Sequence, residues 1–147
     1  MRSSAAKKER DTRIVLSGTA EIELPVTLVA SATLVSGVRR PELVVAACDG
    51  VIDIVAAMFN VSGRELRHHR RSSIGVSRVR QIAMYVTHVA LAFSMREVGH
   101  GFGRDRTTVL YACHQIEDLR DDEEFDRIVA MVERVVTAAF GRQAGQE

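Results

Sequence analysis

From Pro41 to the C-terminal end, hydrophobic residues recur every three or four positions, which is the spacing of helices that bury one face. The first helix is expected to begin at Pro41, because a first turn does not need the amide hydrogen that proline lacks. Asn60-Val61 is expected to end it, and a last helix is expected beyond Asp121-Asp122. The expected inward residues of these two helices are Leu43, Val44, Ala47, Val51, Ile54, Val55 and Met58, and Phe125, Ile128, Val129, Val132, Val135, Val136 and Phe140.

Serine residues mark the expected starts of the next two helices. Ser62-Gly63-Arg64-Glu65 has the sequence of a capping box, so a short helix is predicted over residues 63–69. Ser77 is expected to cap a third helix. The expected inward residues of this third helix are Ile82, Tyr85, Val86, Val89 and Phe93.

A helix-turn-helix is predicted between Ser94 and Leu119. Ser94-Met95-Arg96-Glu97 is a second capping box, which opens a short helix that three glycines close, namely Gly99, Gly101 and Gly103. Asp105 is positioned to cap a longer helix whose inward residues are Val109, Cys113 and Ile116. The fold class predicted from residue 41 onward is therefore all-α, a helix-turn-helix domain of about six helices.

Residues 1–40 are expected to form a poorly ordered, flexible arm, followed by the domain at 41–141 and a tail at 142–147. A targeting peptide is the alternative for the arm, because basic residues precede an apolar stretch and Ala30-Ser31-Ala32 resembles a cleavage site. Glu21 and Glu23 argue against that alternative. The weakly polar run Val26 to Val38 is too short to span a bilayer, so no membrane association is expected.

Charged residues are separated by sign along the chain. The net charge is only +1, but residues 64–106 hold nine arginines against three acidic residues, a local net charge of +6. Residues 117–126 hold seven acidic residues and one arginine. A basic middle beside an acidic flank predicts a surface that binds a polyanion.

Catalytic and metal-binding patterns are missing from the sequence. It has no GxxxxGKT phosphate loop, no HExxH, no GxSxG and no paired-carboxylate motif. His68 and His69 are adjacent and therefore point in different directions, and Cys113 is expected to be buried and inert. The chain is predicted not to be an enzyme and to need no cofactor, nucleotide or metal.

The first turn of the predicted second helix of the helix-turn-helix carries side chains that can read base edges. In the major groove, Asp105 can accept from a cytosine amino group and Arg106 can donate two hydrogen bonds to guanine. The methyl groups of Thr107 and Thr108 can contact a thymine methyl. The alternative is that Asp105 and Thr107 only cap the helix.

Three blocks of sequence carry a family resemblance. They are Val51 to Ser62 (VIDIVAAMFNVS), Arg78 to Tyr85 (RVRQIAMY) and Phe102 to Cys113 (FGRDRTTVLYAC). Together they resemble the C-terminal DNA-binding domain of the bacterial replication initiator DnaA, whose signatures read R-P-R-Q-[IM]-A-M and F-G-G-R-D-H-T-T-V-L-H-A. The resemblance covers about residues 41–120. It implies binding to a nine-base-pair box, with the recognition helix in the major groove and a basic-loop arginine in the minor groove.

The resemblance also implies site residues. The base-contacting positions are Asp105, Arg106, Thr107, Thr108 and Tyr111. The positions implied for the DNA backbone or minor groove are Arg70, Arg71, Arg78, Arg80, Gln81, His88, Met95, Arg96 and Arg104.

Several residues depart from the family pattern. Arg106 and Tyr111 replace histidines, Ser72 stands where the minor-groove arginine is expected, and Val79 replaces proline. One glycine before Arg104 is missing, and His88 replaces a lysine or arginine. Arg70 or Arg71 is expected to substitute for the minor-groove arginine, while the box preference is expected to differ.

The predicted function is sequence-preferring binding of double-stranded DNA in the control of chromosomal replication initiation, in the cytoplasm on the nucleoid. About 40 residues precede the domain, too few for the ATPase module of a full-length initiator, so a stand-alone DNA-binding protein is expected. Its partners are expected to be initiator boxes and, in addition, the initiator or another regulator. The alternatives are a local transcription regulator and a protein-interaction module that binds through residues 117–126.

Overall fold

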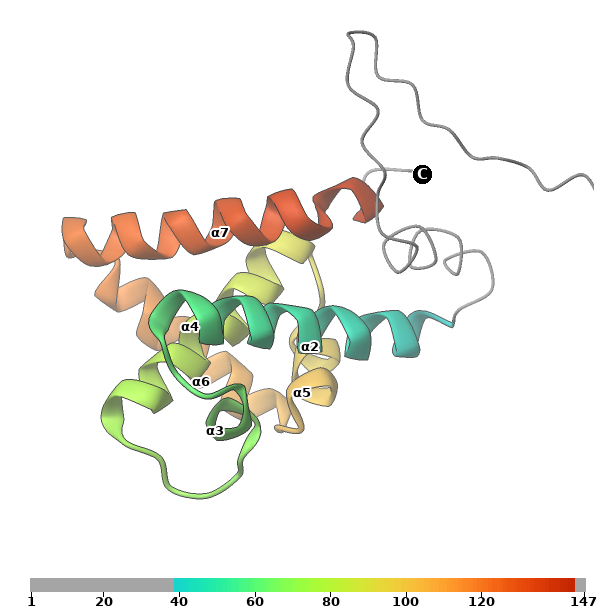
Figure 1. Cartoon of the computed structure of the whole chain (residues 1–147), viewed down its shortest axis with the longest axis horizontal. Helices are drawn as coiled ribbons and strands as arrows, with labels where there is room; N and C mark the ends of the chain where they lie inside the picture. The colour runs from blue at the N-terminus through green and yellow to red at the C-terminus, as the bar shows by residue number, and fades with distance from the viewer. Residues whose placement is uncertain (1–38, 145–147) are drawn as a thin grey trace, which may run out of the picture. The chain divides into compact units, whose positions relative to one another are not determined.

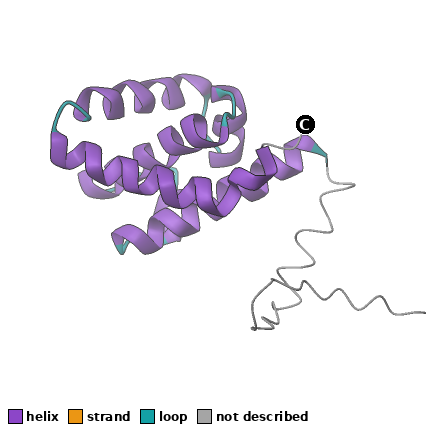
Figure 2. Cartoon of the chain, turned by 90° about the horizontal axis from the view of Figure 1, so that it is seen from above, coloured by secondary structure: helices purple, strands orange, loops and turns teal. Residues whose placement is uncertain are grey.

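A computed structural model describes residues 39–144, and within this range the chain is helical without strands (Figure 2). The helices are α2 (Arg40–Phe59), α3 (Gly63–Arg67), α4 (Ile74–Leu91), α5 (Met95–Phe102), α6 (Arg106–Leu119) and α7 (Glu123–Ala144). The all-α prediction is thus confirmed for this part of the chain. The expectations for residues 1–38 lie outside it. Among the described helices, none combines the length and apolar character that a membrane crossing requires.

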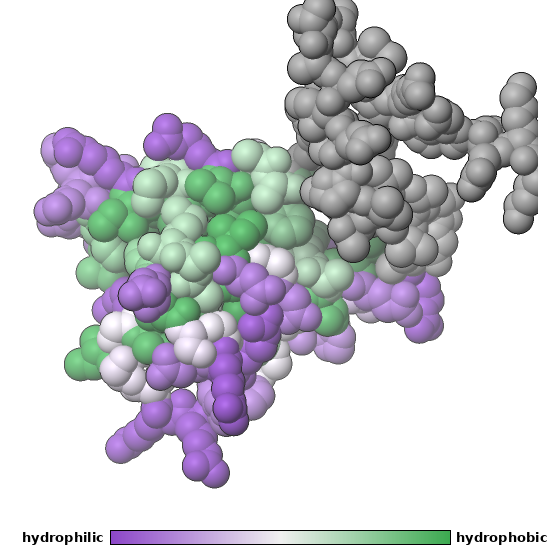
Figure 3. Space-filling model, viewed as in Figure 1, coloured by the Kyte–Doolittle hydropathy of each residue, from purple (hydrophilic) through white to green (hydrophobic). Residues whose placement is uncertain are grey.

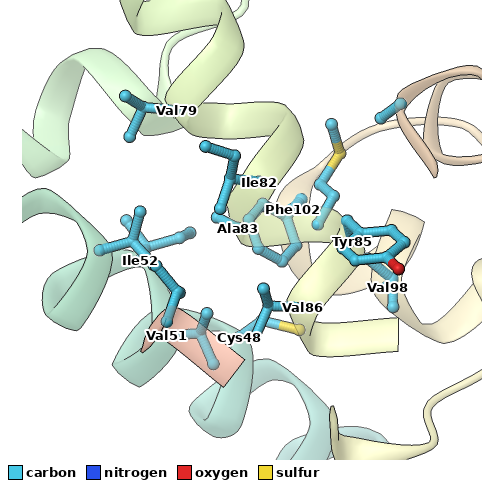
Figure 4. Packing of buried hydrophobic residues seen from close by; sticks show 14 of the residues in the cluster. Cys48, Val51, Ile52, Val79, Ile82, Ala83, Tyr85, Val86, Val98 and Phe102 are labelled. Carbon is cyan, nitrogen blue, oxygen red and sulfur yellow. The ribbon is translucent and has the colours of Figure 1, made fainter. Parts of the chain in front are cut away.

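Helix α4 is the centre of the domain. Helices α2, α6 and α7 all pack against it, and α5 packs against both α2 and α6 (Figure 1). The buried side chains come from every helix, and α4 contributes Ile82, Ala83 and Val86 to their middle (Figure 4). The helix-turn-helix is therefore mounted on a continuous core instead of projecting from it.

Local capping explains where two helices begin. Ser94 Oγ accepts the Glu97 amide at 3.1 Å and Glu97 Oε2 accepts the Ser94 amide at 3.0 Å, so the predicted capping box of α5 is confirmed. Ser62 precedes α3 without a side-chain capping bond, so the box predicted there is wrong. The cap of α4 is Ser73, whose Oγ accepts the Val76 amide at 3.3 Å, and not Ser77. Helix α4 consequently begins at Ile74.

Two glycines of α5 differ from their expected role. Only Gly103 ends the helix, with a left-handed φ of 63° that favours glycine. Gly99 and Gly101 lie inside α5. At Gly101 an added Cβ would lie 2.3 Å from Cys48 Sγ and 2.7 Å from Cys48 Cβ, so α5 approaches α2 as closely as a glycine permits.

Two valines predicted to face the core are exposed. Val89 is 49% exposed and Val135 is 38% exposed. Both continue the apolar spacing of their helices, but they fall at the edge of the face that packs. Val86 and Val136, their neighbours on those helices, are fully buried.

Arg120 anchors α7 to the rest of the domain. Its Nε lies 2.5 Å from Asp126 Oδ1, and its Nη1 lies 2.6 Å from Glu133 Oε1. The same Nη1 donates to the Tyr85 hydroxyl of α4 at 3.2 Å. Part of the acidic flank at residues 117–126 is therefore used in internal ion pairing.

Ala92 ends α4 with a φ of 55°, a left-handed conformation that costs a non-glycine residue about 1–2 kcal/mol. The variant Ala92→Gly is therefore expected to raise the free energy of unfolding by about 0.5–1 kcal/mol in urea titrations. Ala90→Gly is the control, because Ala90 lies inside α4 and glycine there should lower stability by about 1 kcal/mol. An unchanged or lower stability of Ala92→Gly would contradict this prediction.

Candidate nucleic-acid interface

Helices α5 and α6 are joined by a three-residue turn that ends in a capping aspartate. The Arg104 amide donates to the Gly99 carbonyl at 2.8 Å, which closes α5. Asp105 Oδ1 then accepts the Thr108 amide at 2.7 Å and the Thr107 hydroxyl at 2.7 Å. The predicted helix-turn-helix and the predicted cap of its second helix are confirmed.

The cap uses one oxygen of Asp105. The hydrogen bond from the Thr107 hydroxyl and that from the Thr108 amide lower the pKa of this carboxyl group below its ordinary value, which keeps it charged. Both bonds end on Oδ1, and no other described residue donates to Oδ2. Capping and base reading are therefore compatible, because Asp105 is exposed and both of these capping bonds end on a single oxygen.

The outer face of α6 is polar along its first turns. Arg106, Thr107 and Tyr111 are exposed, with Tyr111 at 59%, and Thr108 is half-buried. The opposite face is the buried one, formed by Val109, Ala112, Cys113 and Ile116. His114 also belongs to the exposed face, although it was not among the predicted positions. Its spacing of three from Tyr111 and seven from Thr107 is the signal that identifies it.

A basic loop, residues 68–73, connects α3 and α4 and lies at the end of the molecule opposite α7 (Figure 1). Arg70 and Arg71 are exposed in it and form no salt bridge with any described residue. The surface is strongly hydrophilic at this end of the molecule (Figure 3). Beside the loop is an open hollow of about 450 Å³, lined by Arg64, Arg67, His68 and His69.

Arg80 occupies a different position from the one expected for a phosphate contact. Its side chain is only 7% exposed, and it donates to the carbonyls of Leu66 at 2.9 Å and Glu65 at 2.8 Å. A third bond, at 3.1 Å, reaches the Ser72 hydroxyl. Burial and the nearby charge of Arg104 lower the pKa of Arg80. All three guanidinium nitrogens donate within the protein, so Arg80 holds the basic loop in place.

Arg104 joins the turn of the helix-turn-helix to the basic loop. Its Nη2 donates to the His68 carbonyl at 2.6 Å, while its Nε is buried without a hydrogen-bond partner in the described part of the chain. Gly103 next to it would place a Cβ 3.2 Å from the His69 ring. The two segments are therefore in direct contact.

Of the other residues expected to contact the DNA backbone or minor groove, Arg96 is exposed and the rest are half-buried. Arg96 is exposed in the first turn of α5, and Met95 before it is half-buried. His88 is half-buried, with Nδ1 2.6 Å from the Phe93 carbonyl, so it holds the α4–α5 connection. Arg78 and Gln81 are half-buried and hydrogen-bonded to each other at 2.9 Å.

Comparison with known proteins identifies the domain. Residues 48–116 match the family described as bacterial dnaA protein helix-turn-helix. This part of the chain belongs to that family.

Curated relatives of the DnaA domain support the same assignment. The chromosomal replication initiator protein DnaA of Agrobacterium fabrum is 41% identical over 85 residues, which cover 56% of this chain and 17% of that protein. The DnaA protein of Mesorhizobium japonicum is 45% identical over 71 residues, covering 48% and 14%. The chain therefore spans less than a fifth of the length of these relatives.

A solved structure described as a DNA replication initiation factor has the same fold, with a TM-score of 0.62 and 22% sequence identity. The similarity covers 78% of this chain and 37% of that chain.

One departure from the DnaA pattern has a structural consequence. Val79 replaces the family's proline and lies inside α4, where its side chain is 8% exposed. A proline has no amide hydrogen and would interrupt the helix here. In this chain α4 runs without interruption from Ile74, and the basic loop between α3 and α4 has six residues.

The cysteines of the DnaA domain are buried. Desolvation raises the pKa of Cys48 to about 12 and that of Cys113 to about 11. The predicted burial of Cys113 is confirmed, with 2% exposure. Within residues 39–144, no group of three or more histidine, cysteine, aspartate or glutamate side chains is arranged to hold a metal ion.

Proposed function

We propose that this protein binds double-stranded DNA with sequence preference through α6, and that it acts in the control of chromosomal replication initiation. The observation that carries the proposal is the exposed, polar first turn of α6 beside a basic loop whose Arg70 and Arg71 form no salt bridge with any described residue. Membership of the DnaA helix-turn-helix family supports the same function, and the relatives are replication initiators by name.

In the proposed complex, α6 lies in the major groove. Asp105, Arg106, Thr107 and Tyr111 are exposed on the side of α6 that would face the bases. Arg70 and Arg71 from the basic loop and Arg96 from α5 would contact phosphates or the neighbouring minor groove. Initiator boxes are the proposed targets, with a preference altered by Arg106 in place of histidine.

The protein-interaction alternative is less well supported by the acidic flank. Asp126 is bound to Arg120, and Asp122 Oδ1 accepts the Phe125 amide at 2.9 Å. These two groups stabilise the α6–α7 corner, while Glu117, Asp118, Asp121 and Glu124 stay exposed without a salt bridge in the described part of the chain. The basic side of the domain has the larger number of unpaired charges, which favours a polyanionic partner.

The variant Asp105→Asn tests the proposed base contact. Asparagine keeps an oxygen that can cap α6, so the free energy of unfolding should change by less than about 1 kcal/mol. An amide prefers adenine where a carboxylate prefers the cytosine amino group, so preference at one base pair should change by about 1–3 kcal/mol. Selection of bound duplexes from a random library, followed by titration of single-base variants, measures this change.

Arg134 provides the matched control, because it is exposed on α7. Arg134→Gln should leave the selected sequences unaltered. If Asp105→Asn also selects the same sequences as the original protein, the first turn of α6 does not read bases and the proposed site is wrong.

A further inference from the structure

The basic loop is held at both of its ends by buried or partly buried arginines. Near its first residue, Arg104 donates to the His68 carbonyl at 2.6 Å. Near its last, Arg80 donates to the Ser72 hydroxyl at 3.1 Å. Arg70 and Arg71 lie between these two attachments and stay exposed. The hydrogen bonds of Arg104 and Arg80 thus determine where both exposed arginines lie.

The residue that holds the His68 carbonyl is joined directly through the backbone to the recognition helix α6. Arg104 directly precedes Asp105, the cap of α6, and its own amide is fixed to the Gly99 carbonyl at 2.8 Å. A movement of the turn would therefore move the His68 carbonyl with it. Because the loop has only six residues, its arginines cannot shift far independently.

The acceptors of Arg104 and Arg80 include no carboxylate. Both side chains bond to backbone carbonyls or a hydroxyl, and neither forms a salt bridge within residues 39–144. Their positive charges therefore add to those of Arg70 and Arg71. The repulsion between the Arg80 and Arg104 guanidinium groups would be relieved by a polyanion bound across the loop.

We infer that Arg104 is a positioning residue for DNA recognition, which fixes the basic loop relative to α6 so that both reach one duplex. The inference rests on the proposed function and goes beyond it, because the family resemblance implied a direct backbone contact for Arg104. In this arrangement Arg104 increases affinity through Arg70 and Arg71. Its loss should therefore remove most of what those two side chains contribute.

A double-mutant cycle in the full chain tests the inference. Affinity for a selected duplex is measured for the original protein, Arg104→Ala, the pair Arg70→Ala with Arg71→Ala, and all three changes combined. In the original background, the pair should weaken binding by about 30-fold at low salt. In the Arg104→Ala background, the same pair should weaken binding by only about threefold, because the loop no longer lies against the duplex.

Arg96→Ala is the control, since Arg96 is exposed and lies on α5 away from the loop contacts. Its effect should add to that of the loop pair. Arg104→Lys keeps the charge and one donor toward His68 and should restore part of the lost coupling. If Arg104→Ala is unfolded at the assay temperature, the cycle with Arg104→Lys decides.

Failure of the positioning role of Arg104 and failure of the proposed DNA binding give different results. If the original protein binds duplexes and the effects of Arg104 and the loop pair simply add, Arg104 contacts DNA by itself and the positioning role is overturned. If the original protein shows no duplex binding at low salt, the proposed function fails and the positioning role fails with it.

Discussion

Gly101→Ala is expected to lower the free energy of unfolding by about 3 kcal/mol, the upper end of the cost of overpacking a core. The added methyl group would lie 2.3 Å from Cys48 Sγ and 2.7 Å from Cys48 Cβ, both far inside van der Waals contact. Relief requires α5 to move away from α2, because the second of these atoms belongs to the base of a buried side chain. Urea unfolding monitored by circular dichroism measures the loss.

Two further variants show whether contact with Cys48 is the cause. Gly75→Ala is the matched control, because apart from its chain neighbours and its own helix backbone no atom of a described residue lies within 4 Å of a Cβ added at Gly75. It should be neutral or stabilising by up to about 1 kcal/mol, since alanine favours a helix over glycine. Cys48→Ala removes the sulfur and should recover part of the stability of Gly101→Ala. A loss below about 0.5 kcal/mol for Gly101→Ala would contradict the close approach of the two helices.

Arg80→Ala is expected to lower the free energy of unfolding by about 2–4 kcal/mol, in the range for removing one partner of buried charged hydrogen bonds. The carbonyls of Glu65 and Leu66 and the Ser72 hydroxyl would all lose their donor. The basic loop should become mobile, so duplex affinity should fall by about tenfold or more even at temperatures where the variant is folded. Thermal unfolding and duplex titration on the same samples separate the two effects.

The exposed Arg96 serves as the comparison for Arg80. Arg96→Ala should change stability by less than about 0.5 kcal/mol and reduce the salt dependence of binding by about one phosphate contact. If Arg80→Ala behaves in this way, Arg80 is a phosphate contact as its sequence position implied, and the buried arrangement is wrong.

Capping signals that span three residues predicted the starts of α5 and α6, although Ser62–Glu65, a signal of the same span, does not form its box. The capping box Ser94–Glu97 and the cap Asp105 are such signals, and both form. The start of α4 could not be decided in this way, because Ser73 and Ser77 are equally good caps by residue type. The choice between them depends on how the loop is held by Arg80 from a distance in the sequence.

The first turn of the recognition helix could be predicted for the same local reason. The roles of Arg80 and Arg104 could not, because their acceptors are mainly backbone carbonyls, which carry no residue-type signal. A family sequence pattern does not show whether an arginine contacts DNA or is bonded inside the protein. Its burial, which only the folded chain defines, makes the distinction.

The salt dependence of duplex binding tests the central claim most directly. Arg70, Arg71, Arg96 and Arg106 are exposed and have no acidic partner among the described residues. Neutralising about four to six phosphates predicts a slope of log affinity against log salt concentration of roughly −4 to −5. A slope near zero, or equal affinity for duplex and for an uncharged competitor, would contradict DNA binding by this protein.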